Sequence, residues 1–132
     1  MAVAHNSGSA ESLQERHGAV FTTLRQILKP YEDQLAVKTD KPGNCYLETR
    51  AASLNGRRLF FAGVKIKKNY VSFYLTPLYM FPDLSHGLST TLRKVMQGQS
   101  CFNLTSADND CVLELNRLTK AAFQKLKSER LL

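Results

Sequence analysis

Hydrophobic residues in the first third of the chain recur every three or four positions, which is the period of one helix face. The residues on this face are Leu13, His17, Val20, Phe21, Leu24, Ile27 and Leu28. Ser9 is a suitable N-cap, and Pro30 cannot continue a helix. We therefore expect a helix from Ser9 to Lys29, a short second helix over 30–35 and a connector over 38–44.

The middle of the chain alternates apolar and polar residues, as strands do. Asn55-Gly56 is a strong signal for a two-residue hairpin turn, and Lys68-Asn69 is a weaker one. When positions are counted outward from each turn along its two strands, the residues that face each other are of types that a protein core accepts. The pairs are Ala51 with Phe60, Thr49 with Ala62, Leu47 with Val64, Cys45 with Ile66, Ile66 with Val71, Val64 with Phe73 and Ala62 with Leu75. Since a one-residue slip would turn every side chain to the other face, this agreement predicts a three-stranded meander over 44–76.

Three further elements follow a break at Pro77 and Pro82, between which residues 78–81 are expected to form a packed loop. They are a short helix over 90–97 with Ser89 as N-cap, a fourth strand over 100–104 and a long amphipathic helix beginning at Asp108 or Asn109. Two long amphipathic helices need an apolar surface to cover. The sequence thus predicts an α+β fold, in which an antiparallel sheet carries the N- and C-terminal helices on one face.

The length of 132 residues suits one domain, which we expect over 9–132 after a disordered segment over 1–8. No apolar run resembles a signal-peptide core or approaches a membrane span, so a cytoplasmic protein that contacts no membrane is expected. The three cysteines, Cys45, Cys101 and Cys111, are odd in number and lack Cys-x-x-Cys spacing. We interpret them as reduced thiols.

The net charge of the chain indicates which kind of partner it favours. Eighteen Lys and Arg residues against eleven Asp and Glu give a net charge of +7, which favours anionic partners. Histidines and cysteines are scattered rather than placed at zinc-binding spacing, and no glycine-rich phosphate loop is present. We therefore expect no catalytic residues, no metal ligands and no cofactor.

Part of the second half has a familiar pattern. The segments that carry it are Gly63-Val64-Lys65-Ile66, Tyr70 to Leu75 with Pro77 and Tyr79, and Met96 to Leu104. Over residues 58–126 the chain resembles the YdhG-like family of small bacterial domains of unknown function (domain of unknown function 1801), which is frataxin-like in architecture. The resemblance implies an α+β fold with helices on one sheet face, and it implies no catalytic residues.

Some members of that family are regarded as frataxin-like iron chaperones, a role that depends on an acidic surface around the first helix and the sheet edge. The corresponding region of this chain holds few acidic residues, set among cations. They are Glu11, Glu15, Glu32 and Asp33. Hard metal ions need clustered oxygen ligands, so iron delivery is the second hypothesis rather than the first.

The predicted register also defines the sheet face that the helices leave open. It places Tyr46, Lys65 and Ser72 side by side, with aromatic residues flanking them. The candidate binding residues are Tyr46, Arg50, Phe61, Lys65, Lys67, Tyr70 and Tyr74 on this face, and Tyr79 and Phe81 in the loop that follows. Such a surface could stack bases while its lysines neutralise phosphates. Alternatively, it is a solvated face whose lysines keep the sheet soluble.

The leading hypothesis is a non-enzymatic binding module for an anionic partner, single-stranded nucleic acid included. It would act through the open sheet face or through residues 78–81, which form either an exposed lip for a ligand or homodimer contact, or a segment folded over the core edge. A small enzyme using Cys101 or Cys111 is the third hypothesis, and it requires a reactive thiolate.

Overall fold

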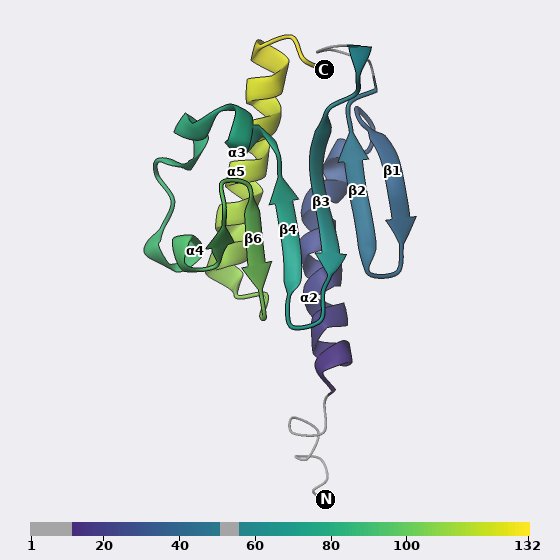
Figure 1. The fold of residues 1–132 in the computed structure, drawn as a ribbon, viewed down its shortest axis with the longest axis vertical. Helices are drawn as coiled ribbons and strands as arrows, with labels where there is room; N and C mark the ends of the chain where they lie inside the picture. Colours follow the sequence, from purple (N-terminus) through teal and green to yellow (C-terminus); the bar gives the residue numbers. More distant parts are fainter. Residues whose placement is uncertain (1–11, 51–55) are drawn as a thin grey trace, which may run out of the picture.

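The computed structural model describes residues 12–50 and 56–132, which form one antiparallel sheet with the long helices behind one of its faces (Figure 1). The strands are β1 (Ala36–Lys41), β2 (Asn44–Glu48), β3 (Phe60–Ile66), β4 (Val71–Leu75), β5 (Met96–Gln97) and β6 (Cys101–Leu104). The helices are α2 (Leu13–Leu28), α3 (Pro77–Met80), α4 (Thr90–Lys94) and α5 (Asn109–Ser128), with 3₁₀ turns η1 (Lys29–Tyr31) and η3 (Pro82–Ser85). Within these residues the six strands lie in the order β1-β2-β3-β4-β6-β5. The α+β class and the placement of both long helices on one face are confirmed.

Helix α2 begins with a capping box rather than at the predicted Ser9, which lies outside the described residues. The Ser12 hydroxyl accepts a hydrogen bond from the Glu15 amide at 3.0 Å, and the Glu15 carboxylate accepts one from the Ser12 amide at 3.1 Å. This reciprocal pair satisfies two of the amide groups that a helix start leaves free. The short helix predicted over 30–35 is instead the single turn η1, which contains Pro30.

The connector predicted over 38–44 is wrong, because β1 and the start of β2 occupy it. The two strands form a hairpin in which Lys41 pairs with Asn44 around Pro42-Gly43. Gly43 has a φ of 76°, the left-handed conformation that glycine adopts without steric cost in such turns. As an edge strand with mostly exposed side chains, β1 lacks the apolar alternation by which a strand is recognised in a sequence.

The register predicted between the second and third strands of the meander, β3 and β4, is confirmed. Ile66 pairs with Val71, Val64 with Phe73, and Ala62 with Leu75. At the turn, the Lys67 amide donates to the Tyr70 carbonyl at 2.8 Å, so Lys68 and Asn69 are its central residues. A two-residue loop leaves the strands no freedom to slip, which explains the agreement.

The register predicted between β2 and β3 is wrong by two residues. Leu47 pairs with Ala62 rather than Val64, and Cys45 pairs with Val64 rather than Ile66. Phe60 pairs with Glu48, whereas its predicted partner Ala51, like Asn55 of the predicted turn, lies outside the described residues. β2 ends at Glu48 and β3 begins at Phe60, so a long connection replaces the tight hairpin. A shift of two residues leaves each side chain on its predicted face.

A β-bulge at the start of β3 changes the face of two residues. Leu47 pairs with Ala62 and Glu48 with Phe60, so Phe61 is the extra residue of the bulge. Phe61 turns into the core, where it is 0% exposed and its ring lies 5.7 Å from that of Tyr31. The prediction that Phe61 lies on the open face is therefore wrong, because side-chain alternation reverses across the bulge.

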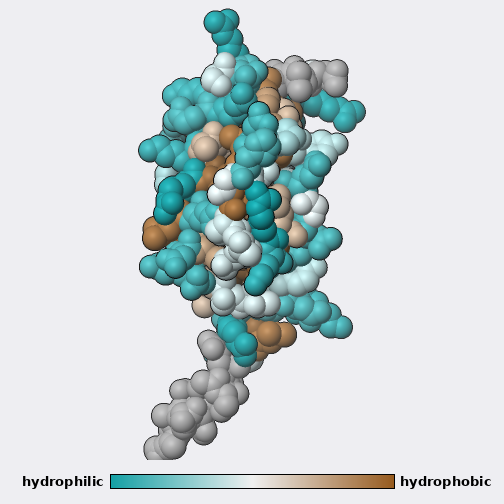
Figure 2. Space-filling model, turned by 90° about the vertical axis from the view of Figure 1, so that its left-hand side faces the viewer, coloured by the Kyte–Doolittle hydropathy of each residue, from teal (hydrophilic) through white to brown (hydrophobic). Residues whose placement is uncertain are grey.

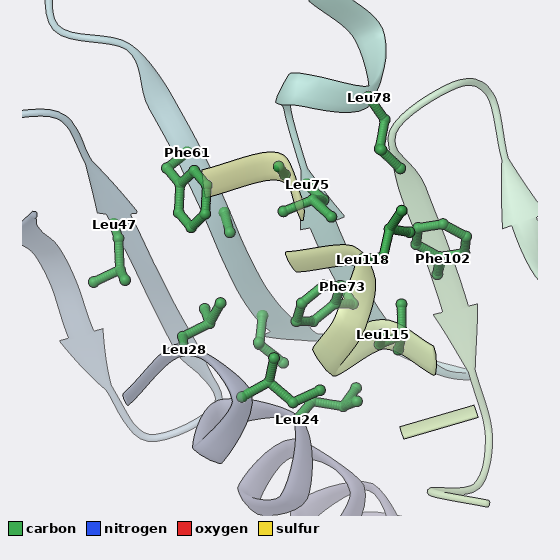
Figure 3. Close-up of a cluster of buried hydrophobic side chains, with 14 of the residues drawn as sticks. Leu24, Leu28, Leu47, Phe61, Phe73, Leu75, Leu78, Phe102, Leu115 and Leu118 are labelled. Atoms are coloured by element: carbon green, nitrogen blue, oxygen red, sulfur yellow. The ribbon is translucent and has the colours of Figure 1, made fainter. Parts of the chain in front are cut away.

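The core lies between the sheet and the two long helices (Figure 3). Leu24 and Leu28 of α2, together with Leu115 of α5, point toward Phe73 and the neighbouring sheet residues (Figure 3). The residues predicted to face the helices are Cys45, Leu47, Val64, Ile66, Val71 and Phe73. All of these are buried except Ile66, which is partly buried and packs against the core.

The remaining elements differ from their predictions mainly in length. Residues 78–81 contain most of the one-turn helix α3 rather than a loop, and the helix expected over 90–97 is the shorter α4. Ser89 is confirmed as the N-cap of α4, since its hydroxyl accepts from the Leu92 amide at 3.1 Å. The predicted fourth strand is β6, which pairs with β4 and with the two-residue β5, a strand too short to show alternation. Among the described helices, none has both the length and the apolar character that crossing a membrane requires.

Candidate functional site

No helix of the described residues covers the sheet face turned away from α2 and α5, which we call the open face (Figure 1). Two rows of paired residues cross it. One row consists of Tyr46, Gly63 and Tyr74, and the other of Asn44, Lys65, Ser72 and Asn103. A hollow of about 500 Å³ lies over these rows, with aromatic residues in its wall and lysines at its edge. We call this region the open-face hollow.

Gly63 is the floor of the open-face hollow. A β-carbon at this position would stand 2.6 Å from the Tyr46 β-carbon and 3.0 Å from the Cys45 carbonyl oxygen. The ring of Phe60 leans over the same place, since its ζ-carbon would be 3.1 Å from that β-carbon. Only glycine fits under such a close approach, and an aromatic ring covering a strand glycine is a known means of stabilising it.

Three aromatic rings stand around this floor. The ring centroids of Tyr46 and Phe60 are 5.1 Å apart with planes at 74°, and those of Phe60 and Tyr74 are 6.3 Å apart at 53°. Tilted and edge-to-face pairs of this kind are the favoured arrangements of neighbouring aromatic rings. All three side chains are half-buried, so part of each remains accessible in the hollow.

The charge around the open-face hollow is positive. Lys65 and Lys67 line it and are exposed, and neither forms an ion pair with any described residue. Glu48 also lines it, but its carboxylate lies 3.3 Å from the Arg58 guanidinium. The acidic group is thereby neutralised, while the two lysines keep their charges free for a ligand.

Beside Lys65 the open face carries a polar cluster. The Asn103 side-chain oxygen accepts from the Ser72 hydroxyl at 2.7 Å and from the Cys101 thiol at 3.3 Å. These two bonds orient the amide, and its Nδ2 group donates no hydrogen bond within the described part of the chain. Asn103 therefore presents a donor at the edge of the face.

All three cysteines are free thiols. Burial raises the pKa of Cys101, although a hydrogen bond from Ser72 and the charge of Lys67 act in the opposite direction. Burial also raises the pKa values of Cys45 and Cys111. Since the thiolate is the reactive form, this environment disfavours the cysteine-dependent chemistry of the third hypothesis.

The structure brings four of the predicted site residues together around the open-face hollow: Tyr46, Lys65, Lys67 and Tyr74. Tyr46 lies opposite Gly63, however, and not beside Lys65 as predicted, because of the register shift between β2 and β3. The residues that line the hollow also include Arg58, Phe60 and Gly63, which the pattern of polar and apolar positions does not assign to a site. A glycine inside a strand was the one local signal that could have marked the hollow.

The other predicted site residues lie elsewhere. The Arg50 guanidinium donates to the carbonyls of Leu35 and Glu32, each at 3.3 Å, so it ties the end of β2 to the segment before β1. Phe61 is in the core, and Tyr70 is at the β3–β4 turn, outside the residues that line the hollow. None of these three residues belongs to the candidate site.

The segment of residues 78–81 folds over the edge of the core. Leu78 is buried, whereas Tyr79 is 66% exposed. Phe81 is partly buried, with the ammonium nitrogen of Lys125 5.1 Å from its ring centroid. Tyr79 and Phe81 thus lie apart from the open-face hollow, and a single exposed ring does not make a lip.

An iron chaperone needs clustered metal ligands. Within residues 12–50 and 56–132, no three His, Cys, Asp or Glu side chains lie together in a group that could hold a metal ion. Two of the acidic residues near the first helix and the sheet edge are already engaged. The Arg25 guanidinium lies 2.5 Å from the Glu32 carboxylate and 3.5 Å from that of Asp40.

A second hollow of about 520 Å³ lies between α5 and residues 84–89. One of the two acidic groups that line it, Glu114, is committed to holding the fold, because its carboxylate accepts from the amide and hydroxyl of Ser89 at 2.8 and 2.6 Å. On the side of the molecule that carries α4, apolar residues form small patches between hydrophilic ones (Figure 2).

No protein-family model, curated protein or solved structure matches the chain.

Proposed function

We propose that the domain is a non-enzymatic binding module that holds an anionic ligand on its open sheet face. One observation carries the proposal: Lys65 and Lys67 are exposed and unpaired among the described residues, at the edge of a hollow with aromatic walls. Ligand sites are typically concave and mostly apolar, with a few placed polar groups that determine orientation. The open-face hollow has this composition.

Electrostatics support an anion in particular. The whole chain has a net charge of +7, which attracts anions from a distance. At short range, Glu48 is the acidic residue lining the open-face hollow, and Arg58 neutralises it. An incoming anion therefore meets two free cations and no free carboxylate in the lining.

An intracellular place of action is part of the proposal. Cys45, Cys101 and Cys111 are free, and disulfides are rare in the reducing compartments inside cells. The raised pKa values of these thiols also support binding rather than thiol catalysis, because burial disfavours the reactive thiolate form.

The test is a titration at low salt in which the full chain is added to a labelled polyanion and binding is measured as fluorescence anisotropy. Two polyanions are used, inorganic polyphosphate and a short oligothymidylate. The charge reversals Lys65→Glu and Lys67→Glu are combined in one variant. Saturable binding by the natural chain and its loss in this variant is the expected result. Both lysines are exposed, so the melting temperature should change little.

A matched control combines Lys120→Glu with Lys127→Glu. These lysines are exposed on α5, behind the opposite face of the sheet, and their reversal changes the net charge by the same amount. The control variant should keep most of the affinity. An equal loss in the two variants, or no binding of either polyanion by the natural chain, overturns the proposal.

A further inference from the structure

We infer that the anionic ligand is single-stranded nucleic acid, with a base stacked on the accessible part of the aromatic rings in the open-face hollow and phosphates at Lys65 and Lys67. The inference rests on the proposed function, because it names the class of anion that the same site takes. Beyond a negative charge, the ligand then has a planar ring that the aromatic residues of the site bind.

The arrangement of the rings points to a flat ligand. Tyr46 and Tyr74 lie on either side of Gly63 in one row across three strands, and the Phe60 ring covers the glycine between them. Phe60 packs at 5.1 Å from Tyr46 and 6.3 Å from Tyr74, which holds both tyrosine rings in place before a ligand arrives. A base can stack on such preformed aromatic surfaces, whereas a ligand such as polyphosphate makes no use of them.

The lysines continue the site along the same strand. Gly63 and Lys65 are successive same-face positions of β3, roughly 6.6 Å apart along the strand, and Lys67 follows directly after its last residue, Ile66. The aromatic floor and the two cations therefore form one line on the open face. A nucleic-acid strand that stacks one base on these rings can run its backbone along this line.

Two features favour a single strand over a duplex. The bases of a duplex are already stacked on each other, so tyrosine rings on a sheet cannot reach their faces, whereas unpaired bases can be splayed out. Asn103 also presents its Nδ2 donor beside Ser72, which separates it from Lys65, and its oxygen is held by Ser72 and Cys101. An amide in this place can bond the exposed edge of an unpaired base.

A second copy of the chain fits the face less well. Two copies packed face to face would bring Lys65 and Lys67 of each toward the same cations of the other. Like charges placed together across an interface oppose association. Charge complementarity therefore selects an anionic strand as the occupant.

The experiment compares three probes of equal length on the natural chain: oligothymidylate, an abasic deoxyribose-phosphate oligomer with the same charges, and a DNA duplex. Oligothymidylate is expected to bind about tenfold more tightly than the abasic oligomer, from stacking of a base on the tyrosines. Equal affinity for these two overturns this inference while leaving anion binding intact. Tighter binding of the duplex also overturns it, and no binding of any probe overturns the proposed function as well.

Variants of Tyr74 test the stacking partner directly. Tyr74→Leu should lower the affinity for oligothymidylate to that for the abasic oligomer without changing the latter, whereas Tyr74→Phe should keep the preference. If both variants keep it, the placement of the base is overturned. Should Tyr74→Leu fail to fold, the comparison of Tyr74→Phe and the natural chain on the two probes still decides the inference.

The salt dependence tests the phosphate contacts. Each phosphate neutralised on a single strand contributes about 0.7 to the slope of log affinity against log salt. The double variant Lys65→Ala and Lys67→Ala should therefore reduce this slope by about 1.4. An unchanged slope overturns the assignment of phosphates to these lysines.

Discussion

Tyr46 and Gly63 face each other on β2 and β3, so closely that a β-carbon on Gly63 would stand 2.6 Å from that of Tyr46. The backbone oxygen of Cys45 would be 3.0 Å away and has little freedom to move. Close packing therefore leaves no space for a larger residue at the position that forms the floor of the open-face hollow.

The first prediction follows from the short distance between Tyr46 and Gly63. Gly63→Ala should lower the free energy of unfolding by about 1–3 kcal/mol, since an extra carbon in a filled space forces its neighbours to shift. Gly18→Ala is the matched control: apart from its chain neighbours and the backbone of α2 itself, no described atom lies within 4 Å of a β-carbon at this position, and alanine is about 1 kcal/mol better than glycine in a helix. Urea denaturation measures both. Stabilisation by Gly63→Ala would contradict the packing described.

The bulge in β3 leads to the second prediction, which compares two adjacent phenylalanines. Phe61→Ala should cost about 3–5 kcal/mol of stability because Phe61 is fully buried against Tyr31 and Phe123. Phe60→Ala should cost clearly less, since Phe60 is only half-buried on the open face. Regular alternation without a bulge predicts the reverse order. Denaturation of the two variants under identical conditions therefore tests the bulge.

A third prediction concerns alkaline pH. Burial raises the pKa values of Cys45, Cys101, Cys111 and Tyr31, so the folded chain keeps protons that the unfolded chain releases. Stability should be complete at neutral pH and should fall as the pH rises above about 8.5, the ordinary pKa of cysteine. The urea midpoint measured from neutral pH to about pH 10 checks this.

A variant identifies the groups responsible for that pH dependence. Cys45→Ala removes one of the titrating thiols, so its stability should fall less steeply with pH than that of the natural chain, whatever its stability at neutral pH. A urea midpoint that stays constant across the alkaline range in the natural chain is incompatible with the buried thiols.

Arg50 is the subject of the fourth prediction. Its two hydrogen bonds to the carbonyls of Leu35 and Glu32 are part of the fold, so Arg50→Ala should cost about 1 kcal/mol of stability. The affinity for oligothymidylate should remain within about twofold, because Arg50 lies outside the open-face hollow and screening weakens its charge at a distance. Arg57→Ala removes the same charge from an exposed residue without a side-chain hydrogen bond among the described residues. This control should leave stability unchanged.

The candidate site was predictable where strands alternate regularly. Tyr46, Lys65, Lys67 and Tyr74 were assigned to the open face from a period of two, and a register error of two residues leaves that assignment intact. Phe61 was misassigned because a bulge has no reliable pattern in a single sequence. The roles of Phe60 and Gly63 follow from that bulge and from the approach of Tyr46, which depend on contacts between strands.

Periodicity by itself determined the two long helices, the inward face of the strands and the β3–β4 hairpin, since these depend on contacts between residues close in the chain or joined by a two-residue turn. Tertiary structure alone decided that β1 and β5 are strands at all, because edge strands form by hydrogen bonding to a neighbour rather than by their own apolar pattern. It also decided the register of β2 on β3, which the long connection between Glu48 and Phe60 leaves free. The open-face hollow exists because the pairing of β2 on β3, together with the β3–β4 hairpin, places a glycine between two tyrosines and near two lysines that form no ion pair within residues 12–50 and 56–132.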